Sequence, residues 1–210
     1  MRGMVVPKLP YRERVVKPFA TITSIVAPLL RDNIDTDAII PSREMRSTGR
    51  TGLADGLFAP WRYTEGRTPD PDFVLNRSEY ADAKILAAGA NFGCGSSREH
   101  AVWALAEWGI RAVIAESFAP IFRNNALRNG LLPVALDKEL IASLAGQEAR
   151  IDLGSQTVSG HPFEIEAEAK TMLIEGLDAI DLTLKHRAAI DAWAAGDRVR
   201  RPWVYLERTA

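Results

Sequence analysis

Apolar positions change their period along the chain, and these changes predict an alternation of strands and helices. Three short apolar runs are typical of buried strands, namely 84–89, 111–116 and 131–136. A segment with helical spacing follows each run, namely 96–109, 119–130 and 137–147. This βαβαβα order predicts a parallel sheet with right-handed crossovers.

The segments on either side of this alternation complete the predicted fold. The β-branched run 19–30 predicts a first strand or strand pair, and 150–169 alternates around turns as in an antiparallel hairpin. Residues 178–196 have apolar spacing near 3.6 and predict a C-terminal helix. The polar stretch 31–53 is much longer than a connecting loop needs to be, which indicates function. We therefore expect an α/β fold, with a central mostly parallel sheet flanked by helices and a strand-rich rim.

Composition adds limits on domains and partners. The chain has 210 residues, 47% hydrophobic and 25% charged, with a net charge of -1. That balance is typical of a globular protein and argues against nucleic-acid binding. No apolar run is long enough for a membrane span. We expect a basic N-terminal arm at 1–18 that is not a secretory signal, a single domain at 19–196 and a C-terminal tail at 197–210.

Cysteine usage limits the metal chemistry. Cys94 is the one cysteine of the chain, so no internal disulfide forms and a reducing cytoplasm is expected. One thiol cannot alone hold an iron–sulfur cluster or a structural zinc ion. Any metal is therefore expected to come from elsewhere, and we interpret Cys94 as a small buried residue.

The stretch NFGCGSSREH, residues 91–100, carries the candidate chemistry. Gly93 and Gly95 permit positive φ and a close approach of the backbone to a ligand. Ser96 and Glu99 have the spacing of a capping box, which by itself predicts only a well-started helix. The same helix N-terminus, together with the guanidinium of Arg98, also favours an anionic substrate. Both interpretations stay open at this point.

This stretch departs from two familiar anion-binding loops, and a nearby histidine does not supply a base. A P-loop lysine is absent. The dinucleotide fingerprint fits Gly93 and Gly95 but has Arg98 in place of its third glycine, while Glu116 ends the next strand about where the ribose-binding acid belongs. A dinucleotide-binding oxidoreductase is therefore the alternative. His100, four residues after Ser96 on the predicted helix, is interpreted as structural rather than as a base.

Several blocks, taken together, resemble one family. They are NIDTDAIIPSRE (33–44), RTGL (50–53), DFVLN (72–76), NFGCGSSREHAVWAL (91–105), GIRAVIAESFAPIFRNNALRNGLLPV (109–134) and GLDAIDLTLKH (176–186). They resemble the small subunit of 3-isopropylmalate dehydratase of leucine biosynthesis, which is similar to the swivelling C-terminal domain of aconitase. The resemblance covers about residues 19–195.

The resemblance implies a reaction and a partner. The reaction is the isomerisation of 2-isopropylmalate and 3-isopropylmalate through 2-isopropylmaleate, by loss and re-addition of water. A large partner subunit carries the [4Fe-4S] cluster, so this chain binds no cofactor and no metal of its own. The resemblance implies that the cluster's open iron binds the substrate hydroxyl and carboxylate as a Lewis acid.

The resemblance also assigns roles to individual residues. Ser96 is the base that takes the proton from carbon, and positive potential around it is needed because a free serine is a weak acid. The substrate-binding residues are expected to be Ser97, Arg98, Asp37, Met45 and Arg46. Gly93 and Gly95 are expected to offer backbone N–H groups to an anion.

One segment departs from the family pattern and keeps other substrates open. Glu44, Met45 and Arg46 stand where an aromatic residue or leucine is frequent in bacterial members. Met45 suits an isopropyl group, whereas Arg46 suits a third carboxylate, as in a homoaconitase. A citraconate- or methylmalate-type dehydratase and a non-catalytic binding module also remain as alternatives.

Overall fold

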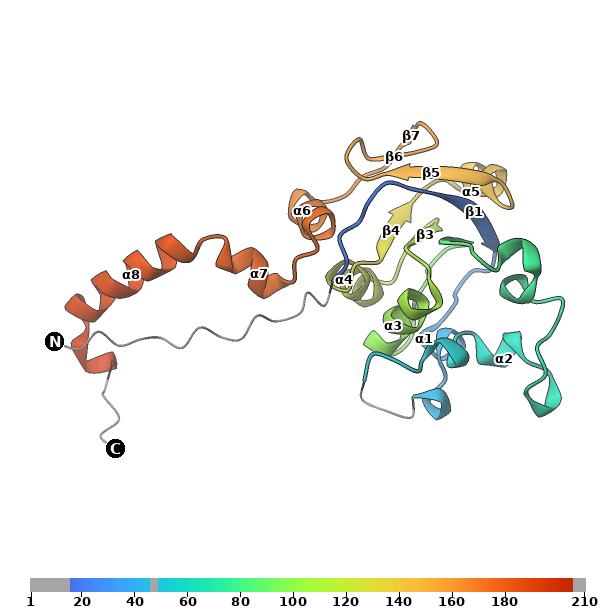
Figure 1. Cartoon of the computed structure of the whole chain (residues 1–210), viewed down its shortest axis with the longest axis horizontal. Helices are drawn as coiled ribbons and strands as arrows, with labels where there is room; N and C mark the ends of the chain where they lie inside the picture. Colours follow the sequence, from blue (N-terminus) through green and yellow to red (C-terminus); the bar gives the residue numbers. More distant parts are fainter. Residues whose placement is uncertain (1–15, 46–48, 206–210) are drawn as a thin grey trace.

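One curled seven-stranded sheet organises the computed structural model, which describes residues 16–45 and 49–205 (Figure 1). The strand order is β4-β3-β2-β1-β5-β6-β7. The strands are β1 (Ile22–Leu29), β2 (Ile85–Ala88), β3 (Ala112–Ala115), β4 (Leu132–Ala135), β5 (Glu148–Asp152), β6 (Thr157–Val158) and β7 (His161–Pro162). Strands β1 to β4 pair in parallel, and β5 to β7 add an antiparallel rim beside β1. The predicted parallel sheet with a strand-rich rim is confirmed.

The helices alternate with the parallel strands as predicted. The helices are α1 (Thr36–Ile39), α2 (Ala59–Arg62), α3 (Glu99–Trp108), α4 (Pro120–Arg128), α5 (Lys138–Leu144), α6 (Ala167–Glu175), α7 (Ala179–Leu184) and α8 (Arg187–Arg200). The described residues also form short 3-10 helices, namely η1 (Ser42–Glu44), η2 (Ala54–Gly56), η3 (Glu65–Arg67), η4 (Val74–Asn76), η5 (Ser78–Tyr80) and η6 (Pro202–Val204). The order β2-α3-β3-α4-β4-α5 confirms the βαβαβα interpretation.

The apolar strand sequences follow from burial on both faces. All four residues of β2 and of β3 are buried, as is usual for parallel strands covered by helices. Side chains alternate between two cores: Leu86 and Val113 face the core shared with α3, while Ile85 and Ile114 face the core shared with α5 and α6. The two cores fix the helices on opposite faces of the sheet.

Three local predictions were wrong. Helix α3 begins at Glu99 and not at Ser96, and no side chain caps its N-terminus. Helix α6 was missed, because its sequence follows directly on the hairpin. The expected helix 178–196 is two helices separated at Lys185 and His186. The capping box that does form lies at Asp178 and Asp181, where both side-chain-to-backbone hydrogen bonds are present.

Helices α7 and α8 with η6, residues 179–204, form an arm that extends away from the sheet (Figure 1). Within the described chain, the element packed closely against α8 is η6. Helix α8 runs to Arg200, so it continues into the segment expected to be a tail. Residues 1–15 of the expected basic arm lie outside the described residues. No helix in the described part of the chain combines the length and apolar character of a membrane span.

Candidate active site

Two motifs far apart in sequence lie side by side along what we call the seam, residues 31–36 beside 89–96. The Asn33 N–H donates to the Ala90 carbonyl at 2.8 Å, and the Gly89 N–H donates to the Arg31 carbonyl at 3.0 Å. Further along, the Thr36 N–H donates to the Cys94 carbonyl at 2.8 Å, and Asp35 and Cys94 form a parallel bridge. The seam joins the IDTD segment to the GCGSSR segment at the carboxyl ends of β1 and β2.

Gly93 is required by packing within the seam. Its φ is +76°, and a Cβ there would lie 2.2 Å from the ring of Phe122. Its N–H donates to the Ile34 carbonyl at 2.7 Å. This N–H group is therefore not available to an anion, and the expectation for Gly93 was wrong. Gly95 has φ +90°, is exposed, and makes no hydrogen bond through its N–H among the described residues.

Ser96 and Ser97 precede the helix and are exposed. The Ser96 carbonyl accepts a hydrogen bond from Thr36 Oγ1 at 2.9 Å, which fixes the backbone. Neither serine hydroxyl is hydrogen-bonded within the described residues. Glu99 does not complete a capping box, because its carboxylate accepts instead from Asn129 Nδ2 at 2.8 Å. The serine backbone is therefore held while the hydroxyls stay open.

Arg98 and Asp37 meet across the seam as an ion pair. The Arg98 side chain is 18% exposed and that of Asp37 is 57% exposed. The buried Nη1 atom of Arg98 makes this contact with Asp37 Oδ1. Asp35, and not Asp37, caps α1, through a 2.6 Å hydrogen bond from the Ala38 N–H. Asp37 is therefore not the turn-forming residue, and its carboxylate contacts the arginine.

The segment expected to select the substrate is only partly described. Met45 is half-buried against the core, and Arg46 lies outside the described residues. Glu44 is buried and its carboxylate accepts hydrogen bonds from both terminal nitrogens of Arg67, at 3.0 to 3.1 Å. Glu44 therefore anchors the backbone before Met45.

His100 has a structural contact. Its ring lies 4.8 Å from the ring of Trp103, centroid to centroid. Because Ser96 is outside the helix, the predicted alignment of Ser96 with His100 on one helix face is wrong.

Sequence reasoning missed Thr36 and Glu107. Glu107 accepts hydrogen bonds from the successive N–H groups of Gly52, Leu53 and Ala54, at 2.7, 2.6 and 2.9 Å. Partial burial alone would raise the pKa of this carboxyl, but the three backbone donors outweigh it and hold the pKa below its usual value. An acidic residue in the last turn of a helix opposes the helix dipole, and this was the available signal for Glu107.

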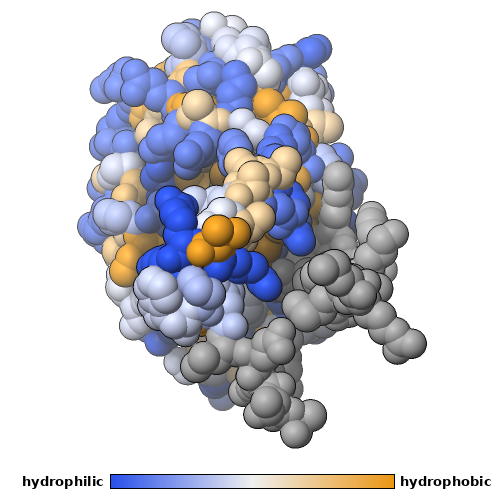
Figure 2. Space-filling model, turned by 90° about the vertical axis from the view of Figure 1, so that its left-hand side faces the viewer, coloured by the Kyte–Doolittle hydropathy of each residue, from blue (hydrophilic) through white to orange (hydrophobic). Residues whose placement is uncertain are grey.

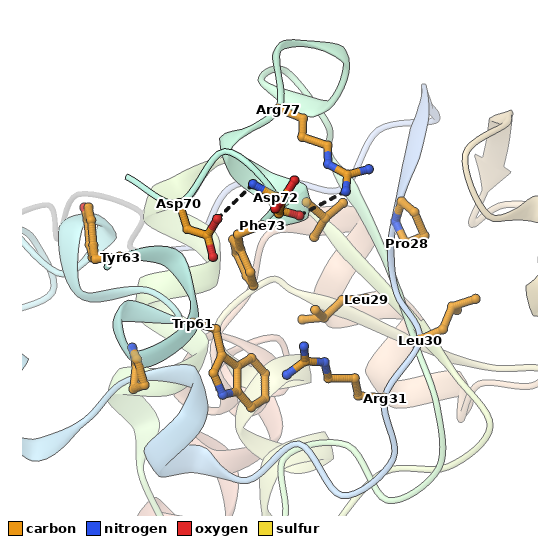
Figure 3. Close-up of a pocket in the computed structure, with 12 residues that line it drawn as sticks. Pro28, Leu29, Leu30, Arg31, Trp61, Tyr63, Asp70, Asp72, Phe73 and Arg77 are labelled. Atoms are coloured by element: carbon orange, nitrogen blue, oxygen red, sulfur yellow. Dashed lines mark hydrogen bonds between the residues drawn. The ribbon is translucent and has the colours of Figure 1, made fainter. Parts of the chain in front are cut away.

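A hollow of about 530 Å³ lies at the end of β1 beside α2 and η4 (Figure 3). The guanidinium of Arg31 lies over the ring of Trp61, 4.6 Å from its centroid. The Asp72 N–H donates to Asp70 Oδ1 at 2.9 Å, and Arg77 donates to the Asp72 carbonyl at 3.0 Å. Ser96, Arg98 and Asp37 do not line this hollow, so the motif residues form a separate, open site.

The described residues do not fit a metal cluster. They contain no group of three His, Cys, Asp or Glu side chains that could hold a metal ion, and Cys94 has no second thiol. Nor does the site suit a dinucleotide. Glu116 lines a cavity of about 150 Å³ with Asp32 and Lys138, below the roughly 300–1,000 Å³ of small-molecule pockets.

The parallel sheet, with the glycine-serine-arginine block at its carboxyl edge, defines the class of aconitase C-terminal domains, whose family model matches residues 16–139. The chain is 52% identical to the 3-isopropylmalate dehydratase small subunit of Cupriavidus necator, over 91% of this chain and 100% of that protein. It is 47% identical to the protein of the same name from Dinoroseobacter shibae, over 90% and 100%. The chain belongs to the family of 3-isopropylmalate dehydratase small subunits.

A solved structure has the same architecture. The crystal structure of 3-isopropylmalate dehydratase from Methanocaldococcus jannaschii has a TM-score of 0.63 and 32% identity, covering 83% of this chain and 99% of that chain. Together with the family match, this likeness replaces the dinucleotide-binding alternative.

Proposed function

We propose that this chain is the small subunit of a 3-isopropylmalate dehydratase, and that it interconverts 2-isopropylmalate and 3-isopropylmalate through 2-isopropylmaleate together with a large subunit. We assign the [4Fe-4S] cluster to the large subunit, because the described residues of this chain contain no group of side chains that could hold a metal ion. This chain supplies the base that accepts the proton and the residues that bind the substrate carboxylates.

Ser96 acts as the base in this proposal. Its Oγ, as the alkoxide, accepts a proton from a substrate carbon, while the bond from the neighbouring carbon to its hydroxyl group breaks with both electrons going to oxygen. The hydroxide takes up a proton from solvent and leaves as water. Re-addition of water with the opposite regiochemistry gives the isomer. The alkoxide needs positive potential, and Arg98 and the exposed backbone at Gly95 supply it.

Arg98 binds a substrate carboxylate, and Asp37 orients it. Arginine presents a planar fork of donors that matches a carboxylate. Ser97 contributes a second hydroxyl beside that carboxylate, and Met45 contacts the isopropyl group. Arg46, which lies outside the described residues, is a proposed specificity residue.

The observation that carries the proposal is the ion pair between Arg98 and Asp37 beside two exposed serine hydroxyls. The seam brings these groups together from segments about sixty residues apart in sequence. The buried Nη1 atom of Arg98 makes the contact with Asp37. The planar guanidinium carries further donors that suit an incoming carboxylate.

The test measures 2-isopropylmaleate by its ultraviolet absorbance, starting from 3-isopropylmalate. The reactions contain this chain alone, the anaerobically reconstituted large subunit alone, or both. Activity confined to the mixture supports the proposal. If a mixture with an intact cluster is inactive, homoaconitate- and citraconate-type acids are the next substrates, and Arg46 becomes the residue to exchange.

A matched pair of variants tests the base. In the reconstituted complex, Ser96→Ala is expected to lower kcat by about 10²- to 10⁴-fold, the usual contribution of a positioned base. Ser97→Ala is expected to act mainly on KM. Full activity of Ser96→Ala would remove Ser96 from the mechanism and favour a non-catalytic role for this chain.

A further inference from the structure

Two carboxylates hold the backbone close to Met45 and within the segment Gly49–Ala54. Next to Met45, buried Glu44 is paired with Arg67, which also donates to the Asp55 carbonyl at 3.1 Å. Within the segment, Glu107 accepts the N–H groups of Gly52, Leu53 and Ala54. A carboxylate that accepts several backbone N–H groups forms strong, charge-assisted hydrogen bonds. The backbone is therefore held both at Glu44 and at residues 52–54.

Helix α3 provides a second contact for the same segment. The guanidinium of Arg50 lies over the ring of Trp103, 5.0 Å from its centroid. Trp103 and Glu107 are four residues apart and so share a face of α3. One face of α3 therefore contacts Arg50 through the ring of Trp103 and residues 52–54 through the carboxylate of Glu107.

Trp103 is itself tied to the start of the helix. Its Nε1 donates to Asn129 Oδ1 at 2.9 Å, and Asn129 Nδ2 donates to Glu99 at 2.8 Å. Glu99 is the first residue of α3, next to Arg98. The segment Gly49–Ala54 contacts helix α3, and the proposed catalytic residues directly precede the same helix.

We propose that Glu107 and Trp103 are positioning residues that set the segment Gly49–Ala54 relative to Ser96 and Arg98, and so determine which substrate side group the enzyme accepts. This inference rests on the proposed function. Neither residue needs to touch the substrate, since each acts through the backbone that it holds.

The substitution Glu107→Gln removes the carboxylate contact but keeps the shape of the side chain. An amide has one acceptor oxygen and an NH₂ group that cannot accept from a backbone N–H, so the three-way contact is lost while the helix is kept. Glu166→Gln is the matched control, because Glu166 accepts from Arg123 Nη2 at 2.7 Å on the surface near α6. Circular dichroism establishes that both variants are folded.

The first experiment is limited trypsin digestion of the free chain, with cleavage after Arg50 followed by mass spectrometry. Release of residues 52–54 is expected to speed this cleavage at least tenfold in Glu107→Gln and not in Glu166→Gln. Trp103→Leu, which removes the ring beneath Arg50, is expected to do the same. Equal cleavage rates in wild type, Glu107→Gln and Trp103→Leu would overturn the proposal, and this readout does not depend on the substrate.

The second experiment compares 3-isopropylmalate with 3-methylmalate in the reconstituted complex. Glu107→Gln is expected to raise KM for the isopropyl substrate about tenfold with kcat within twofold, and to change KM for the methyl substrate less than twofold. An unchanged ratio of kcat/KM between the two substrates would overturn the role in selection. If the wild-type complex does not act on 3-isopropylmalate, the proposed function fails, whereas the digestion result still decides whether the contact holds the segment.

Discussion

The seam and the arm both carry exposed residues, but they differ in what holds them. The seam is a run of backbone hydrogen bonds between 31–36 and 89–96, with polar groups at its surface. The arm exposes seven large apolar side chains, namely Ile180, Leu184, Ile190, Trp193, Val199, Trp203 and Val204. Figure 2 looks at the end of the molecule to which the arm extends, where orange hydrophobic residues lie among blue ones.

This difference separates a region that is complete from one that is not. In the seam, the backbone groups satisfy one another and leave side chains free for chemistry. In the arm, apolar surface stays uncovered, and such patches usually mark interaction sites. Helix α8 also carries charged residues, and the apolar stripe of such an amphipathic helix normally faces a core or a partner.

The largest effect is expected for Gly93→Ala in the seam. The new methyl group would lie against the ring of Phe122, at a position with φ +76°, so both strain and overpacking oppose folding. We expect a loss of about 3 kcal/mol or more in the free energy of unfolding, measured by urea denaturation.

Gly160→Ala is the control for backbone strain alone. Gly160 has φ +88° with no atom within 4 Å of an added Cβ. We expect it to cost about 1 kcal/mol. Equal losses for the two glycine variants would show that Phe122 does not restrict the seam.

A smaller effect is expected for Thr36→Val, which keeps the shape of the side chain and removes the hydroxyl. Thr36 is 2% exposed and its Oγ1 donates to the Ser96 carbonyl. We expect a loss of about 1–2 kcal/mol and lower activity, because the backbone of Ser96 is no longer fixed. Thr183→Val in the arm removes an exposed hydroxyl hydrogen bond of the same length, 2.9 Å, and should change stability by less than about 0.5 kcal/mol. Similar losses would remove the contrast between the regions.

The spacing of apolar residues and the positions of turn residues predicted the strands and helices of the parallel sheet. Buried strands such as 84–89 and 111–116 have apolar runs that only a covered parallel sheet explains. The glycine at 109 ends α3 in the left-handed conformation, as expected from its position. The candidate residues Ser96, Arg98 and Asp37 were found because their motifs resemble those of a known family.

Tertiary contacts decided what the sequence did not reveal. Ser96 and Glu99 have capping-box spacing, yet Thr36 holds the backbone of Ser96 and Asn129 takes the carboxylate of Glu99. Both partners are distant in sequence, so local spacing cannot report them. At Asp178 both hydrogen bonds of the capping box are present, and there the local rule does apply.

The contact of Glu107 predicts a dependence of stability on pH. Its folded-state pKa lies below the ordinary value of 4.5, so its stabilising contribution is complete above that value and is lost as the pH falls through the folded-state pKa. At pH 7, Glu107→Gln is expected to cost about 1 kcal/mol, at the low end for charge-assisted bonds because the residue is exposed. Urea denaturation at several pH values should show that the difference in unfolding free energy between wild type and variant becomes smaller in acid. A gap that is the same at every pH would assign the loss to shape and not to charge.

The smallest effect on stability is expected from removal of the arm. A chain that ends at Leu177 keeps α6 and the N-terminal residues packed on it, since the Phe19 N–H still donates to the Leu173 carbonyl. Because the arm packs closely on no element of the sheet, the free energy of unfolding should change by less than about 0.5 kcal/mol. Affinity for the large subunit, measured by calorimetry, should fall, because the apolar surface that a partner would cover is gone. A loss of stability above 1 kcal/mol would mean that the arm folds back on the body in solution, and unchanged affinity would mean that the partner binds elsewhere.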